Sequence, residues 1–175
     1  MCIRDRYMAM AYGVFVSVGG GKNEVFDNEI TVDNRHATPS TGEAYAFYVG
    51  GSNNGGAFYN NKVESNTPFF WIANRYGVGN NVEVYGNTLI KPKNAAPFPA
   101  VRIGWNQHTA DNVRFFSNRT EGLPFDVEVR DKENASSYDI GWTLTVRTKP
   151  DAEVSVGPEG GAPIASGLSL IHLSE

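Results

Sequence analysis

The residues best suited to acid–base chemistry lie close together in the second half of the chain. Asp126 and Glu128 stand two positions apart in FDVEVR, and in an extended strand this spacing separates their Cα atoms by about 6.6 Å. The separation leaves room for the water that inverting glycosidases activate between two carboxylates. A general acid needs a raised pKa, however, and Arg102 and Arg130 would favour the ionised forms. The pattern therefore favours a surface ladder of ion pairs.

His108 in WNQHTAD is a further candidate for proton transfer, with Asp111 three residues later. Histidine is the usual proton shuttle near neutral pH, but a lone histidine in a loop is more often simply solvated. His108 thus joins Arg102, Asp126 and Glu128 as a catalytic candidate that no further residue supports. The sequence contains no nucleophile motif, phosphate-binding loop or metal-ligand cluster. We therefore expect no metal site and leave catalysis open.

The elements that carry these residues belong to an internal repeat, the first feature to establish in a chain of this kind. A short motif recurs at four places, with two apolar or aromatic residues, then any one residue, then an asparagine. The four copies are VFDN, FYNN, VYGN and FFSN, and they end at Asn28, Asn61, Asn87 and Asn118. A second alternating segment comes before each copy. These segments are Val14–Val16, Phe47–Val49, Phe70–Ile72 and Val101–Ile103, and a fifth is Val127–Val129. Helical periodicity is absent, so the repeat unit is built of short strands.

The repeat resembles the right-handed parallel β-helix of the pectate-lyase-like superfamily over about residues 12–143. The resemblance implies an all-β solenoid of about five coils, each with three short strands in three parallel sheets. Each coil would bury its apolar positions only against its neighbours. Equivalent residues of stacked coils lie about 4.8 Å apart, so we expect the recurrent asparagines to form a ladder of side-chain amide hydrogen bonds.

Strand alternation predicts which residues of the first segments face outward. The central position of each segment should point to solvent, and this outward column reads Phe15, Tyr48, Trp71, Arg102 and Glu128. Exposed aromatic rings stack on the apolar faces of sugars. The alternative is that a long connection, missing coils or another domain covers them. For a second outward column, formed by Phe26, Tyr59, Tyr85 and Phe116, we favour a structural role.

The resemblance implies that this sheet and its neighbouring loops form a groove for a polysaccharide. Arg75, Tyr76 and Asn106 lie just beyond the strand ends and would line the groove with the aromatic column. Either Arg75 or Arg102 would bind a uronate carboxylate through a bidentate pair.

We therefore expect a secreted or cell-surface protein that binds an extracellular, acidic polysaccharide. A lyase or glycoside hydrolase that also cleaves the polymer is one version of this reading. The alternative is a non-catalytic carbohydrate-binding or structural adhesin repeat. No cofactor is evident, and the resemblance alone brings calcium into consideration.

Composition and chain ends set the remaining expectations. A net charge of −4 without a basic patch argues against nucleic acid, and no apolar run reaches the roughly 20 residues of a membrane span. The segments MCIRDR and LSLIHLSE suggest a sequencing adaptor. Nucleotide sequences that encode the two segments are close to being reverse complements of each other. We expect residues 1–6 and 168–175 to be adaptor-derived, with adjoining domains missing at both ends. Residues 7–143 would be a partial β-helix, and residues 144–167 a truncated β-sandwich or a cap.

Overall fold

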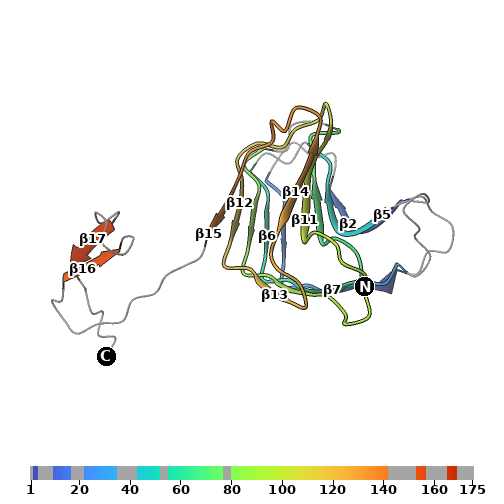
Figure 1. Cartoon of the computed structure of the whole chain (residues 1–175), viewed down its shortest axis with the longest axis horizontal. Coiled ribbons are helices and arrows are strands. Elements are labelled where there is room, and N and C mark those ends of the chain that lie inside the picture. The colour runs from blue at the N-terminus through green and yellow to red at the C-terminus, as the bar shows by residue number, and fades with distance from the viewer. Residues whose placement is uncertain are drawn as a thin grey trace. The chain divides into compact units, whose positions relative to one another are not determined.

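The structure is a computed structural model that forms two compact units, Met1–Trp142 and Thr143–Glu175. It describes residues 2–3, 10–16, 22–34, 43–51, 55–76, 80–141, 153–156 and 165–168. All regular elements of the described residues are strands (Figure 1). The chain is therefore all-β, as the repeat predicts.

Three parallel sheets of five strands make up the first unit. Sheet 1 contains β2 (Met10–Val16), β5 (Glu43–Val49), β8 (Phe70–Ile72), β11 (Val101–Asn106) and β14 (Val127–Asp131). Sheet 2 contains β3 (Glu24–Phe26), β6 (Ala57–Tyr59), β9 (Glu83–Tyr85), β12 (Val113–Phe116) and β15 (Tyr138–Gly141). Sheet 3 contains β1 (Cys2–Ile3), β4 (Glu29–Val32), β7 (Lys62–Ser65), β10 (Thr88–Ile90) and β13 (Arg119–Glu121).

Neighbouring strands in each sheet come from successive turns of the chain. From β2 to β15 the chain visits sheets 1, 2 and 3 in a repeating order, and neighbours within a sheet are three strands apart in sequence. In Figure 1 the colour runs from blue to orange along each sheet for this reason. This is the arrangement of a parallel β-solenoid, in which every strand finds its hydrogen-bond partners in the turns before and after it.

The strand register aligns the apolar positions that alternation predicts to face inward. Val14, Phe47, Phe70, Val101 and Val127 are successive partners in sheet 1, and Val16, Val49, Ile72, Ile103 and Val129 form a second column. Both columns pack in the main core with residues of the other two sheets. Burying a side chain of this size is worth about 1.5 to 3 kcal/mol. The core therefore runs along the axis of the stack, between the three sheets.

The predicted asparagine ladder is present. The side-chain Nδ2 of Asn28, Asn61 and Asn87 each donates to the Oδ1 of the next asparagine at 2.9 Å, and the ladder ends at Asn118. The same Oδ1 atoms also accept the backbone N–H of the preceding asparagine at 2.9 to 3.1 Å. Asn61 and Asn87 are almost fully buried. Each turn of the chain therefore depends on the next to satisfy its amide groups.

The second outward column forms a continuous stack of rings on the outer face of sheet 2. Phe26, Tyr59, Tyr85 and Phe116 lie with successive ring centroids 4.9, 4.9 and 4.7 Å apart and nearly parallel planes. Each inner ring is covered on both faces by its neighbours. This arrangement supports the structural role, because an aromatic ring binds a sugar through its face.

The chain ends contribute two short pairings. Cys2 and Ile3, within the segment expected to be adaptor-derived, pair with Thr31 and Val32 of β4. In the second unit, β16 (Glu153–Val156) pairs antiparallel with β17 (Ala165–Leu168). The adaptor origin of residues 1–6 and 168–175 stays a prediction. The reading of residues 144–167 as a truncated sandwich or cap also stays a prediction.

Replacing a buried ladder asparagine should destabilise the stack. In Asn87→Ala the Asn61 side chain and the Phe58 carbonyl lose hydrogen bonds in a buried site. Because each unsatisfied buried group costs about 1 to 3 kcal/mol, we expect the free energy of unfolding to fall by about 3 kcal/mol. Urea unfolding measures it, with exposed Asn94→Ala as the control. Equal stability of the two variants would contradict the ladder's role.

Candidate functional site

The outer face of sheet 1 carries the predicted aromatic column, but most of the column is covered. Phe15, Tyr48, Trp71, Arg102 and Glu128 are successive partners, as expected. Phe15 is 48% exposed, whereas Tyr48 and Trp71 are only 1% and 0% exposed. The prediction that all three aromatic side chains are exposed is therefore wrong for Tyr48 and Trp71.

Tyr48 and Trp71 are buried because the outer face has a hydrophobic cluster of its own. Tyr45, Tyr48, Trp71 and Ala73 form it, and Tyr12 and Trp105 pack against it. The Trp71 indole N–H donates to the Gly104 carbonyl at 3.1 Å. Tyr45 reaches this face because alternation breaks in β5, where Ala46 and Phe47 both pack in the main core. These aromatic side chains thus cover one another, and of the three aromatic residues in the column only Phe15 stays exposed, at the open β2 end of the sheet.

Phe15 and Tyr76 form a pair of exposed rings at this open end. The Tyr76 side chain is 50% exposed, and its ring meets Phe15 edge-on with centroids 6.2 Å apart. The Arg75 guanidinium carbon lies 5.4 Å from the Tyr76 ring centroid. A backbone hydrogen bond of 2.6 Å from Tyr76 to the Gly50 carbonyl holds the loop after β8 against β5. The structure therefore brings Arg75 and Tyr76 beside Phe15.

Gly50 lets the Tyr76 ring approach Tyr48. A Cβ atom at Gly50 would lie 2.9 Å from Cδ2 of Tyr76 and 3.0 Å from Cε1 of Tyr48, closer than packed carbon atoms approach. The Tyr76 ring meets the buried Tyr48 ring at a right angle, with centroids 6.4 Å apart. The exposed pair and the buried cluster thus form one continuous aromatic surface.

Among the described residues, the buried Tyr48 hydroxyl has no hydrogen-bond partner of ordinary geometry, although the Arg75 guanidinium lies close enough to lower its pKa. Burial raises the pKa of Tyr48 to about 12, with smaller upward contributions from Tyr12 and Tyr76 that the nearby Arg75 guanidinium partly opposes. Leaving such a group unsatisfied costs about 1 to 3 kcal/mol. Native structures contain few such groups, and they often mark functional positions.

Arg102 is held by an ion pair and a hydrogen bond. Its Nε lies 2.6 Å from Glu128 Oε2, and its Nη1 donates to the Tyr45 hydroxyl at 3.1 Å. The Arg102 side chain is only 16% exposed. The predicted pairing of Arg102 with Glu128 is confirmed. Of the two arginines considered for a uronate, Arg75 is thus the one that stands beside the exposed rings.

The remaining catalytic candidates serve local structure. Asp126 Oδ1 accepts the Ala100 N–H at 2.8 Å. His108 closes a tight turn with Trp105 through two backbone hydrogen bonds of 2.7 and 2.8 Å. Within the described part of the chain, no ion pair joins His108 to Asp111.

Asn106 lies in the same turn with a φ of +53°, and its carbonyl accepts the Lys132 N–H at 2.7 Å. Asn106 is about 30 residues further along the chain than Tyr76. The structure thus does not assemble the catalytic candidates and Asn106 into one reactive group.

Sequence reasoning missed Asp131, the one charged side chain buried in the described residues. Its carboxylate accepts the backbone N–H of Ala135 at 2.6 Å and of Ser136 at 3.2 Å. Burial by itself would raise the pKa of Asp131, but hydrogen bonds from the Ser136 side chain and these two N–H groups outweigh it and lower the pKa. The turn-forming DKENAS sequence was the available signal. Asp131 stabilises the turn beside Asn106.

The described residues contain no group of three or more His, Cys, Asp and Glu side chains placed to hold a metal ion. They also contain no helix long and apolar enough to cross a membrane. Comparison of the chain with protein-family models, curated proteins and solved structures gave no significant match.

Asp131→Asn should destabilise the protein at neutral pH but not in acid. Because the folded-state pKa of Asp131 is lowered, the carboxylate stabilises the fold above its unfolded pKa of about 3.9. That contribution is lost as the pH falls through the folded pKa. We expect urea unfolding to show a deficit at neutral pH that closes in strong acid. Glu133→Gln, in the same turn, is the control, and a deficit independent of pH would contradict this account.

Proposed function

We propose that the chain binds an extracellular, acidic polysaccharide through Phe15, Arg75 and Tyr76, at the open end of the outer face of sheet 1. The observation that carries the proposal is the pair of exposed rings, with a guanidinium beside it, above a buried hydroxyl that has no hydrogen-bond partner among the described residues.

The rings provide an apolar platform of suitable chemistry. Phe15 and Tyr76 are among the few large hydrophobic side chains of the described residues that are exposed, and they touch. Contiguous exposed apolar surface usually marks an interface. Aromatic faces favour flat, partly apolar ligands that keep hydroxyls in water, and sugar rings have this character.

Arg75 supplies the preference for an acidic polymer. A guanidinium pairs with carboxylates through two parallel hydrogen bonds. Arg102, by contrast, is already engaged by Glu128 and Tyr45. A uronate whose ring stacks on Tyr76 would place its carboxylate within reach of Arg75, because the guanidinium lies over that ring.

The Tyr48 hydroxyl supplies an anchor for the ligand. It lies in the cluster beneath Tyr76 and beside Arg75. A sugar hydroxyl that reached it would remove the cost of an unsatisfied buried group. The ligand would thereby gain an interaction without breaking one in the protein.

The finer fold assignment and the location belong to the same proposal. Three parallel sheets and the asparagine ladder support a right-handed β-helix of the pectate-lyase-like kind. That resemblance in turn supports a secreted or cell-surface location. We propose binding rather than cleavage, because Asp126, Glu128 and His108 have local structural contacts in the described residues. An adhesin repeat without a glycan ligand is the competing reading.

Tyr76→Ala and Arg75→Ala should each weaken binding to polygalacturonate. We expect each to raise the dissociation constant roughly tenfold, because the first removes a stacking face and the second the partner of the carboxylate. Affinity electrophoresis in gels with and without the polymer measures the effect. Tyr138→Ala, which removes another exposed tyrosine, is the matched control. Unchanged retardation of the Tyr76 and Arg75 variants, or equal loss in the control, would overturn the site.

Tyr48→Phe separates binding from stability. The change keeps the ring contacts and removes a hydroxyl that has no hydrogen-bond partner among the described residues, so the free energy of unfolding should stay equal or rise. Affinity for polygalacturonate should fall, because the proposed anchor is lost. Lower stability would show that the hydroxyl has a partner in the free protein, and unchanged affinity would remove it from the site.

A further inference from the structure

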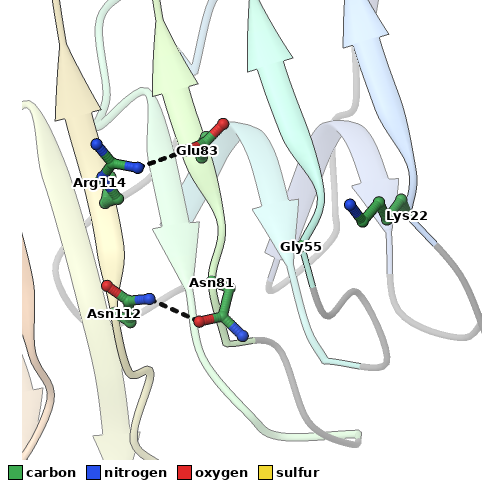
Figure 2. A pocket seen from close by; sticks show the side chains of 6 residues that line it. All are labelled: Lys22, Gly55, Asn81, Glu83, Asn112 and Arg114. Atoms are coloured by element: carbon green, nitrogen blue, oxygen red, sulfur yellow. Dashed lines mark hydrogen bonds and ion pairs between the residues drawn. The ribbon is translucent and has the colours of Figure 1, made fainter.

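A polar hollow of about 400 Å³ lies on the outer face of sheet 2. It is separate from the proposed site on sheet 1. Its volume lies in the range of small-molecule sites, roughly 300 to 1,000 Å³. Figure 2 shows the residues that line it, which are Lys22, Gly55, Asn81, Glu83, Asn112 and Arg114.

The hollow lies where two successive outward positions of one turn have no side chain or only a methyl group. Ala57 pairs with Glu24 on one side and with Glu83 on the other. Two residues upstream, Gly55 occupies the equivalent place between Lys22 and Asn81. Gly55 has a φ of +79°, a conformation that strains other residues. Neither position projects a long side chain, so the space above β6 stays open.

One wall of the hollow is held in place by side-chain pairs. Asn112 Nδ2 donates to Asn81 Oδ1 at 2.6 Å. Arg114 Nη1 lies 3.0 Å from Glu83 Oε1. Figure 2 shows both pairs on the same side of Gly55, and each pair joins the turn that contains β9 to the turn that contains β12. Polar groups that are oriented before binding cost less to order around a ligand.

Lys22 forms the opposite wall and supplies a net positive charge. Its stem extends toward Gly55, with Cε 3.3 Å from the place that a Cβ there would occupy (Figure 2). No carboxylate of the described residues forms an ion pair with its ammonium group. Since Glu83 is paired with Arg114, the lining carries one uncompensated cation. A negative substituent on a ligand would meet Lys22.

We propose that this hollow binds a single sugar ring that carries one carboxylate or sulfate group. Lys22 pairs with the anionic group, and the amides of Asn81 and Asn112 and the Glu83–Arg114 pair contact hydroxyls. The site shares the acidic-sugar class with the proposed function but none of its residues. The chain would therefore contact an acidic glycan on two faces of the stack.

The test is a titration of the full chain, labelled with ¹⁵N, with glucuronate, glucose 6-sulfate and glucose at equal ionic strength. We expect saturable shifts at the amides of Lys22, Gly55 and Asn81 in the millimolar range with an anionic sugar and much weaker ones with glucose. Shifts with only one anionic sugar identify which group is recognised. No saturable shift with either anionic sugar, or equal binding of glucose, would overturn the proposal.

Three variants assign the effect to the hollow. Lys22→Ala should raise the dissociation constant roughly tenfold, and Ala57→Leu, two residues from Gly55 on the same face of the strand, should abolish binding by extending a larger side chain into the hollow. Thr31→Leu introduces the same side chain at an exposed position of sheet 3, and this variant should bind the sugar as the parent protein does. Retained affinity in Lys22→Ala would contradict the site even if Ala57→Leu failed to fold. Tyr76→Ala should leave these shifts unchanged, so failure of the sheet 1 site is distinguished from failure of this one.

Discussion

Amide hydrogen bonds between successive turns are the constraint on which the rest of this structure depends. A buried asparagine such as Asn87 has donors and acceptors that its own turn does not satisfy, and its partners Asn61 and Asn118 lie in the turns before and after it. A shift of one residue in the register would leave these groups unpaired and would also reverse the inward and outward positions of a strand. The ladder and the apolar core therefore require the same register.

That register decides what each outer face presents. On sheet 2 it aligns four rings into a stack whose faces are mutually covered, and it places Gly55 in the hollow that Lys22 and Asn81 also line. On sheet 1 it places Tyr48 and Trp71 side by side, where they become a second core. On these two faces, the surface that we propose as accessible to a ligand lies where a column ends or where it lacks a long side chain. Both proposed sites lie at such places.

Repetition made much of this arrangement predictable from sequence. The aligned columns of sheet 1, the asparagine ladder and the Arg102–Glu128 pair all follow from the spacing of repeated residues. The burial of Tyr48 and Trp71 was not predictable, because alternation assigns a side chain to a face but does not say what covers that face. The covering residues, Tyr45 and Trp105, arise from a break in alternation and from a turn. Asp131 and the hollow depend likewise on contacts between non-repeated positions.

The central claim is that the open end of the sheet 1 face, and not its aromatic column as a whole, recognises an acidic glycan. The most direct measurement is an NMR titration of the full chain with trigalacturonate, following the ring protons of Phe15, Tyr76 and Trp71 and the guanidinium of Arg75. The account predicts saturable shifts and transferred contacts at Phe15, Arg75 and Tyr76, with no sugar contact at Trp71. Sugar contacts at Trp71, or no saturable change at the three exposed residues, would contradict it.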